Sequence, residues 1–449
     1  MALRQLIPVT IIFSLLHASP ASAQSGGHLY ADFEIDIEFN ELDGLSLGSE
    51  AEHNRLVEQE MEFEFDFEYW VNDKFNLFFT GALIDEKETI KSADMKNTRT
   101  GLEFRELGVA FLFGDIIDSE INLGRVEHES ISQWWSWWDD ELDIISLQLW
   151  FGDFETFLAM AEEQAPESTD EDFIDPELDD VQRLIFSMSW EIMDGQFLNF
   201  YYLKHDDKSP NYRVGDLEDI EKIDEEDADL IWKGISYVAG IEHHVIGEID
   251  LELHYSEISG RSAIYEFEDS SSGIVEVSER EDEHINGTAS GYLLRWTPRE
   301  MDEFSLIIAG VNGSGDSDLG DRHNKSYRQT GLQGDLESYG ELYQPEISNL
   351  KVNMFGLQWR IAENMSFALM HFDYRQDKLS DEIRDATIEV DPSGASRDLG
   401  KELDLVYSIE YEETLELFFT YAKFKPGSAY AEYRQDSIDY IGIDFAYKF

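Results

Sequence analysis

Carboxylates are the side chains whose number and spacing first suggest chemistry in this sequence. The stretch EQEMEFEFDFEYWV, residues 58–71, alternates them with apolar and aromatic residues, and the chain holds 97 aspartates and glutamates. Paired carboxylates can hydrolyse glycosidic bonds where a dry pocket raises the pKa of one acid. With 97 acids, such pairs occur throughout the chain and their spacing carries no information about catalysis. We therefore predict no enzyme activity.

Motifs for metals and cofactors are weak. His243 and His244 are adjacent, so a strand would place them on opposite faces, where they could not easily share a metal ion. Asp316, Asp318 and Asp321 in DSDLGD offer closely spaced oxygen ligands for calcium, but the full calcium loop with its closing glutamate is missing. A solvated loop is the favoured interpretation, and we expect no cofactor.

The net charge of −64 and the absence of cysteine exclude several classes of function. A nucleic-acid partner is not expected, because a phosphate backbone is bound through lysines and arginines, and the chain has 33 of these against 97 acids. Without cysteine the chain cannot form disulfides, thiolate-ligated zinc sites, iron–sulfur clusters or a thiol nucleophile. A lipidated cysteine anchor is excluded for the same reason.

The elements that carry these carboxylates have the period of a β-strand, in which successive side chains point to opposite faces. Residues 58–71 place one set on each face: Met61, Phe63, Phe65, Phe67 and Tyr69 against Glu60, Glu62, Glu64, Asp66 and Glu68. The stretch YADFEIDIEF repeats the division, with Ala31, Phe33, Ile35, Ile37 and Phe39 against Asp32, Glu34, Asp36 and Glu38. Helical spacing would mix the two kinds of side chain.

The same pattern, bounded by turn residues, predicts eighteen strands in all. Besides the two above they cover residues 75–85, 100–113, 117–126, 142–151, 153–162, 181–191, 195–206, 231–243, 247–258, 288–297, 302–312, 346–360, 364–374, 400–411, 413–425 and 436–448. Short connections such as NDK and GD alternate with segments of about ten to more than thirty residues. Tight turns at one end, long loops at the other and an even strand number are typical of an all-β, antiparallel transmembrane barrel in the bacterial outer membrane.

The two ends of the chain agree with this prediction. Arg4, the apolar run LIPVTIIFSLL and the small residues ASA at 21–23 are typical of a secretory signal peptide. The apolar run is well short of the roughly 20 residues that a spanning helix needs. The last strand ends on Phe449, like the assembly signal of outer-membrane barrels. We expect a signal peptide at residues 1–23 and one barrel domain at residues 24–449.

Electrostatics decides which face of the predicted strands meets water. Carboxylates along one face of a strand lie roughly 6.7 Å apart. Neighbours then repel by about 0.6 kcal/mol in bulk water but by on the order of 12 kcal/mol, an upper bound, in a dry interior. The carboxylate face must be hydrated, which fits lipid outside and a water-filled lumen inside. The competing interpretation is a soluble sheet whose aromatic face packs on a second sheet.

Several segments of the chain resemble the alginate export porins, outer-membrane barrels through which some bacteria secrete alginate. These segments are FRELGVAF (104–111), LGRVEHES leading into WWSWWDDELDIISLQLW (123–150), YRQTGLQGD and YGELYQPEISNLKV (327–352), HFDYRQD (371–377) and KELDLVYSIEY (401–411). The resemblance implies an eighteen-stranded, monomeric barrel that passively exports a linear polysaccharide. It also implies a narrow pore lined by arginines and some carboxylates, gated by loops or turns.

The resemblance supplies candidates for the pore lining. They are Arg105, Arg125, Arg295, Arg360, Asp404 and Asp444, beside the strand acids Asp32, Glu34, Asp36, Glu38, Glu62, Glu64, Asp66 and Glu68. Alternation turns Arg295, Arg360 and Asp444 inward, because their neighbours in sequence are apolar. For Arg105 and Arg125 the alternation breaks near an expected bulge, so their direction stays open.

The acidity departs from what an alginate conduit needs, because alginate carries an anion at every sugar and should require a positive potential. A neutral or cationic glycan, a polyanion with divalent cations, or cation-selective permeation through a general porin would suit an acidic lumen better. Adaptation to salty surroundings would also explain the acidity. A soluble glycan-binding protein or barrel enzyme is the alternative from another class.

The expected surroundings follow from the same interpretation. We expect outer-membrane lipid and a polysaccharide as partners, and leave open a periplasmic secretion partner at the short-turn end. The WWSWW motif at residues 134–138 could stack on sugars, but we favour an interfacial belt or a loop plug.

Overall fold

A computed structural model describes residues 27–44, 47, 55–90, 95–114, 117–129, 139–166, 168–169, 174, 176, 178, 180–207, 212–271, 273–317, 322–332, 339–384, 386–388, 390–411 and 414–449. The expected signal peptide, the WWSWW motif, Asp318 and Asp321 lie outside these residues. None of the helices in the described ranges is long and apolar enough to cross a membrane.

Eighteen long antiparallel strands account for most of the described residues. They are β1 (His28–Asp43), β2 (Arg55–Asn72), β3 (Phe75–Ile90), β4 (Met95–Phe113), β5 (Asp118–Glu129), β6 (Asp139–Phe151), β7 (Phe154–Ala161), β8 (Val181–Met193), β9 (Gln196–Asp207), β11 (Glu226–His243), β12 (Gly247–Ser271), β13 (Ile274–Thr297), β14 (Phe304–Gly313), β16 (Leu350–Ala362), β17 (Met365–Gln376), β18 (Asp398–Tyr411), β19 (Leu415–Pro426) and β20 (Ile438–Lys448). The loops add two short strands, β10 (Leu217–Asp219) and β15 (His323–Asn324), and the 3-10 turns η2 (Ile220–Lys222) and η4 (Glu432–Arg434).

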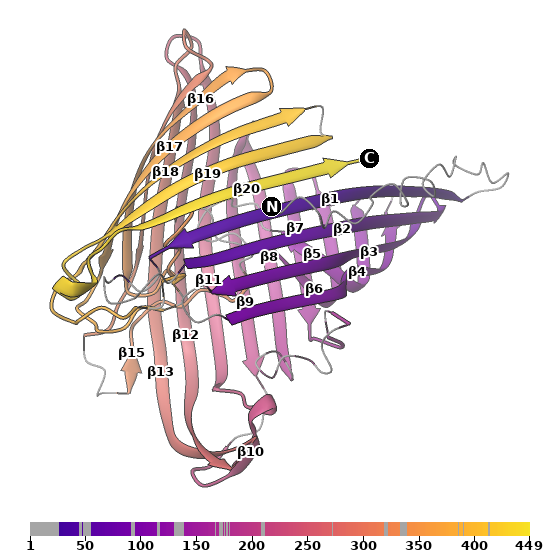
Figure 1. The fold of residues 1–449 in the computed structure, drawn as a ribbon. Helices are drawn as coiled ribbons and strands as arrows, with labels where there is room; N and C mark the ends of the chain where they lie inside the picture. The colour runs from indigo at the N-terminus through magenta and orange to yellow at the C-terminus, as the bar shows by residue number, and fades with distance from the viewer. Residues whose placement is uncertain are drawn as a thin grey trace, which may run out of the picture.

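The eighteen long strands close into one barrel (Figure 1). Each pairs with the next along the chain, β9 pairing with β11 and β14 with β16. The ring closes where β1 meets β20, from Glu34 opposite Lys448 to Asp43 opposite Asp439. Phe449 adds two backbone hydrogen bonds to Phe33. Closure leaves no sheet edge along this seam, as a membrane barrel requires.

Connection lengths alternate as the sequence predicted, with one group of exceptions. Residues 259–287 were expected to form a long loop, but the structure continues β12 to Ser271 and begins β13 at Ile274. The alternating pattern explains the extension, since Ala263, Tyr265 and Val277 gather on one face against Tyr212. The hairpin projects beyond the other strands, and β10 pairs with its β13 edge (Figure 1). In the same way, β3 continues to Ile90 and β4 begins at Met95, so both strands include residues that were expected to form a loop.

The division of faces is visible in β1 and β2. Phe33 lies opposite Phe65, and Glu34 lies opposite Glu64, so the two strands share one apolar and one acidic face. On the apolar face of the barrel, Ile145 is 61% and Met160 65% exposed. Large apolar side chains stay this exposed on a barrel wall when they face hydrocarbon. The carboxylates therefore face the lumen.

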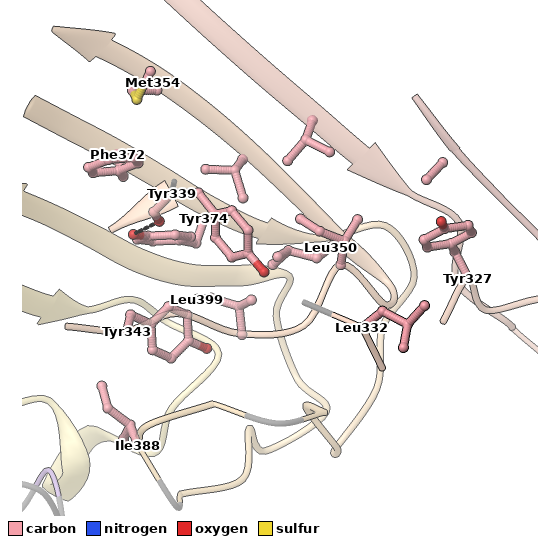
Figure 2. Close-up of a cluster of buried hydrophobic side chains, with 14 of the residues drawn as sticks. Tyr327, Leu332, Tyr339, Tyr343, Leu350, Met354, Phe372, Tyr374, Ile388 and Leu399 are labelled. Carbon is pink, nitrogen blue, oxygen red and sulfur yellow. Dashed lines mark hydrogen bonds between the residues drawn. The ribbon is translucent and has the colours of Figure 1, made fainter. Parts of the chain in front are cut away.

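The connection between β14 and β16 folds back into the barrel and corrects one expectation. We call its described residues 322–332 and 339–349 the inner loop. Its buried side chains Tyr327, Leu332, Tyr339, Leu342, Tyr343 and Ile347 join one apolar cluster with side chains of β16 to β19 (Figure 2). The aromatic residues of every strand were expected to face lipid, but Phe372, Tyr374 and Phe424 point inward beneath this loop. The inner loop packs against these rings and shields them from the water of the lumen.

Candidate functional site: the barrel lumen

The acidic wall of the lumen is built from β1, β2 and β20. Acids stand directly opposite one another along β1 and β2, as Asp32 and Asp66, Glu34 and Glu64, Asp36 and Glu62, and Glu38 and Glu60. Asp444 of β20 lies on the other side of Glu38, and Glu68 accepts a hydrogen bond of 3.0 Å from the indole of Trp70. Like charges directly opposite destabilise a sheet, so this wall needs water or cations to be stable.

Arg105 is the cation set into this wall. In the β3–β4 register Thr80 lies opposite Glu106 and Gly81 opposite Phe104, which leaves Arg105 as the extra residue of a bulge. The bulge turns its guanidinium inward, where the nitrogens lie 2.6 Å from carboxylate oxygens of both Glu62 and Glu64. The predicted break in alternation is therefore present here, and it gives Arg105 the direction that the sequence left open.

A second group of charges lies at the short-turn end of the lumen. Arg295 and Arg360 line a cavity of about 410 Å³ together with Glu248, Asp250, Thr297, Asp302, Glu303, Ser305, Gln358, Glu363, Asn364, Met365, Ser366 and Glu410. The guanidinium of Arg295 lies 4.0 Å from the carboxylate of Asp250. Outward-facing Trp296 and Trp359, next in sequence, fix both arginines on the inner face. Such a mixture of guanidinium, carboxylate, hydroxyl and amide groups suits a hydrated polar ligand.

Asp404 lies on the inner face but does not border open lumen. It is 1% exposed, and its carboxylate lies 3.3 Å from the backbone nitrogen of Glu341 in the inner loop. Neighbouring Glu402 accepts hydrogen bonds from the backbone N–H groups of Leu342 at 2.9 Å and Tyr343 at 3.0 Å. The predicted pore-lining position is thus corrected: Asp404 is covered by the loop that it helps to hold. Asp404 acts as a hydrogen-bond acceptor here, because the backbone N–H of Glu341 in the inner loop needs a partner when it is buried.

Further contacts fix the inner loop to β11, β12 and β13, and sequence reasoning missed all of them. Arg328, 3% exposed, lies between Glu226 of β11 and Glu283 of β13, and the Trp232 indole donates to its backbone oxygen at 2.8 Å. The Tyr327 hydroxyl donates to Ser256 of β12 at 3.0 Å. Tyr327 and Arg328 lie in a segment that carries the family resemblance, but strand alternation cannot indicate where a loop docks.

Tyrosine hydroxyls support the loop from β17 and the β19–β20 connection. Tyr374 donates to the backbone oxygen of Tyr339 at 2.7 Å (Figure 2). Tyr343 and Tyr430 share a hydrogen bond of 2.8 Å between their hydroxyls. Burial raises the pKa of Tyr343 well above its ordinary value and that of Tyr430 to about 12. Both hydroxyls therefore stay neutral, and this pair does not titrate at physiological pH.

Arg125, another predicted pore residue, lies on the outer side of the wall. Its neighbour Val126 lies opposite Leu142 and packs in the interior cluster, so Arg125 and the facing Asp143 point outward. Arg125 is 6% exposed and lies beneath residues 162–166. A guanidinium nitrogen of Arg125 lies 2.9 Å from a carboxylate oxygen of Glu163 and 3.2 Å from one of Asp143. Arg125 is thus buried in the wall and does not border open lumen, although it lines a cavity of about 160 Å³ together with Arg105. Gly124, at φ +132°, sits where the sequence suggested irregular backbone.

We expect Arg125→Ala to loosen residues 162–169 without changing ion selectivity. Removing one partner from a buried charge cluster costs about 3–5 kcal/mol, because the carboxylates left behind are uncompensated. Limited proteolysis should cut this segment faster than in wild type, while the reversal potential in a salt gradient stays the same. A changed reversal potential with an intact segment would instead place Arg125 in the ion path.

Neither the expectation of no cofactor nor the weak calcium motif at Asp316, Asp318 and Asp321 is tested. Asp316 accepts a hydrogen bond from the backbone N–H of Lys325 at 2.9 Å, while its proposed co-ligands Asp318 and Asp321 are outside the described residues. Within the part of the chain that the structure covers, no group of three or more histidines or carboxylates is arranged to hold a metal ion.

Comparisons with known proteins agree with this architecture. The family described as alginate export matches residues 31–444. The alginate production protein AlgE of Pseudomonas aeruginosa is 26% identical over 182 residues, a match that spans 35% of this chain and 36% of that protein. The chain thus aligns with about a third of the length of this curated relative.

Solved structures show the same fold at low sequence identity. The outer membrane protein OprD of Pseudomonas aeruginosa is 11% identical with a TM-score of 0.54, covering 96% of this chain and 97% of that chain. OpdK of the same organism, solved with vanillate, is 8% identical with a TM-score of 0.56 over 94% of this chain and 98% of that chain. Fold and family together make the protein a channel rather than an enzyme and place it in the bacterial outer membrane. The chain belongs to the alginate export family of outer-membrane β-barrels.

Proposed function

We propose that this barrel conducts a linear polysaccharide passively across the outer membrane. The supporting observation is the lumen's combination of a hydrated carboxylate wall on β1 and β2 with the arginine-containing cavity at the short-turn end. A chain of sugars can pass such a surface through many weak, exchangeable contacts, whereas tight binding would stall it. The partial match to a protein named for alginate production supports a glycan as the substrate class.

The charge of the lumen narrows the choice of glycan. Opposed acids along β1 and β2 give a negative potential, and Arg105 is already paired with Glu62 and Glu64. A bare polyuronate would be repelled by this wall. We therefore favour a neutral or cationic glycan, or a polyanion that travels with divalent cations.

A second candidate function is a general, cation-selective porin on the same scaffold. The acidic wall itself favours it, because rings and ladders of carboxylates select cations by their potential. The two functions differ in one respect that can be measured: only the glycan conduit should be blocked by a cognate polymer.

The experiment is a planar-bilayer recording with added glycan oligomers of neutral, cationic and polyuronate type, the last with and without calcium. We expect one class to block the current, and Arg295→Gln with Arg360→Gln to weaken that block about 10-fold, the value of losing one charge-assisted hydrogen bond. Arg299→Gln is the matched control, because Arg299 lies on the turn at the same end and outside the cavity lining. Absence of block by every class would leave the porin as the function.

The remaining expectations about the chain's surroundings are also proposals. We propose that residues 1–23 are removed on export, that residues 24–449 form one domain, and that the barrel works as a monomer. A periplasmic partner would dock at the turns beside Phe449. Mass determination of the mature protein, and its size in detergent, test the first and third of these.

A further inference from the structure

A basic patch lies on the outer face of four neighbouring strands. It consists of Lys351 on β16, Arg375 on β17, Lys401 on β18, and Lys423 and Lys425 on β19. Each alternates with a buried residue that points into the barrel, such as Tyr374, Glu402 or Phe424, so the cations point away from the lumen. Five of the chain's 33 basic residues are therefore gathered on one part of the outer wall.

The strand register brings these like charges together. Lys351 lies opposite Arg375, and Lys401 lies opposite Lys425. Arg375, Lys401 and Lys423 have 58, 57 and 44% of their side chains exposed. Opposed like charges cost stability in a sheet. In a chain with a net charge of −64, a surface that carries them needs a reason other than general solubility.

Nearby carboxylates neutralise the patch only in part. Asp373 lies 2.9 Å from Arg375 and 3.5 Å from Lys401, Asp377 lies 2.7 Å from Lys351, and Asp439 lies 2.9 Å from Lys423. Asp43 borders the patch, opposite Asp439. Asp398 also lies opposite Arg375 in the register. The three paired carboxylates contact four of the five cations, no ion pair of Lys425 is found among the described residues, and exposed lysine ammonium groups keep donors for a further anion.

The patch lies at the extracellular boundary of the membrane. Lys351 and Lys401 are near the starts of their strands, and Arg375, Lys423 and Lys425 are near the ends of theirs, all at the long-loop end of the barrel. Long loops of such barrels are extracellular. On the turn side of these cations, the same outer face carries the exposed apolar residues Phe355, Leu403, Phe419 and Tyr421. The cations are therefore level with the headgroups of the outer leaflet, beside its acyl chains.

We propose that this basic patch is a binding site for a phosphate-bearing lipid headgroup of the outer leaflet. Phosphate is a strong acceptor for both ammonium and guanidinium groups. Basic residues at a membrane surface contribute about fivefold each to anionic lipid binding. The acyl chains of the same lipid would cover Phe355, Leu403 and Phe419, so one lipid molecule would contact both the basic patch and these apolar residues. The site is on the opposite side of the wall from the lumen and does not depend on what the channel conducts.

The probe is diphosphorylated lipid A, titrated into the detergent-purified barrel and followed by native mass spectrometry. We expect Lys401→Gln with Lys425→Gln to weaken binding about 10- to 100-fold. The matched control is Lys87→Gln with Lys233→Gln, which removes two outward-facing charges elsewhere on the wall; it should bind as wild type. Lipid A without its phosphates should bind weakly to all three proteins, and millimolar inorganic phosphate should not displace the diphosphorylated form.

Several results would overturn the proposal. Equal binding of the phosphorylated and dephosphorylated lipids would show that acyl chains alone dominate. Equal loss in the control pair would show a nonspecific charge effect, and full displacement by inorganic phosphate would show an ion site rather than a lipid site. Heat-modifiable gel mobility confirms that each variant is folded. Unchanged channel conductance in the Lys401 and Lys425 variant separates this outcome from any failure of the proposed transport function.

Discussion

Glu402→Ala is expected to release the inner loop and raise the single-channel conductance. The carboxylate of Glu402 accepts hydrogen bonds from the backbone N–H groups of Leu342 and Tyr343. A buried donor left without an acceptor costs about 1–3 kcal/mol. If the free energy that holds the inner loop in place falls by about 3 kcal/mol, the population of the released loop rises about 100-fold.

The matched control for this change is Glu402→Gln, which keeps the shape of the side chain and one acceptor oxygen. Because one of the two loop N–H groups then loses its acceptor, the released population and the conductance of Glu402→Gln should lie between those of wild type and Glu402→Ala. Proteolysis gives a second readout, because a released loop is cut within residues 322–349. If Glu402→Ala conducts as wild type and resists proteolysis, the inner loop does not restrict the lumen.

Neutralising the acidic wall is expected to abolish most of a cation preference. The test variant combines Asp32→Asn, Asp36→Asn, Glu38→Gln and Glu60→Gln, four wall acids that make no ion pair with Arg105. Each charge stabilises a monovalent cation 5 Å away by about 0.8 kcal/mol in water, and salt screens this over about 8 Å. We expect the cation-to-anion permeability ratio, measured as a reversal potential in a potassium chloride gradient, to fall by about fivefold or more.

The same variant should also melt at a higher temperature, because it removes like charges that face each other across β1 and β2. The control neutralises Glu266, Glu268, Glu276 and Glu279 on the projecting hairpin, which should leave the reversal potential nearly unchanged. Because Glu266 lies opposite Glu279 and Glu268 opposite Glu276, the melting temperature should rise in the control as well. A wild-type channel that prefers anions, or a reversal potential that does not move in the variant, would show that these carboxylates are outside the ion path.

The strands and their two faces could be predicted from sequence because each strand carries its own signal. From Asp32 to Glu38 on β1 and from Glu58 to Glu68 on β2 every second residue is acidic, and the closed register follows from pairing neighbours in chain order. Arg295 and Arg360 could be directed inward for the same reason, since tryptophan follows one and precedes the other. Local alternation is sufficient where a side chain meets only lipid or water.

The inner loop could not be predicted because its partners are distant in sequence and look like any other strand residue. Phe424 alternates with lysines on β19 just as outward aromatics alternate with acids on β2, yet its ring stacks on Tyr343 at 4.4 Å. Arg125 could not be placed from sequence because Gly124 and the cover of residues 162–166 decide its surroundings. Long-range packing, rather than local pattern, sets these positions.

The most direct test of the two-faced wall uses the absence of cysteine in this chain. Asp36→Cys and Ile37→Cys change adjacent residues of β1, and Ile37 is 45% exposed on the apolar face. In a bilayer, a charged, water-soluble thiol reagent should modify the Asp36→Cys channel quickly and change its current, while the Ile37→Cys channel stays unmodified. Rapid modification of Ile37→Cys with protection of Asp36→Cys would contradict a hydrated acidic lumen inside a lipid-facing apolar wall.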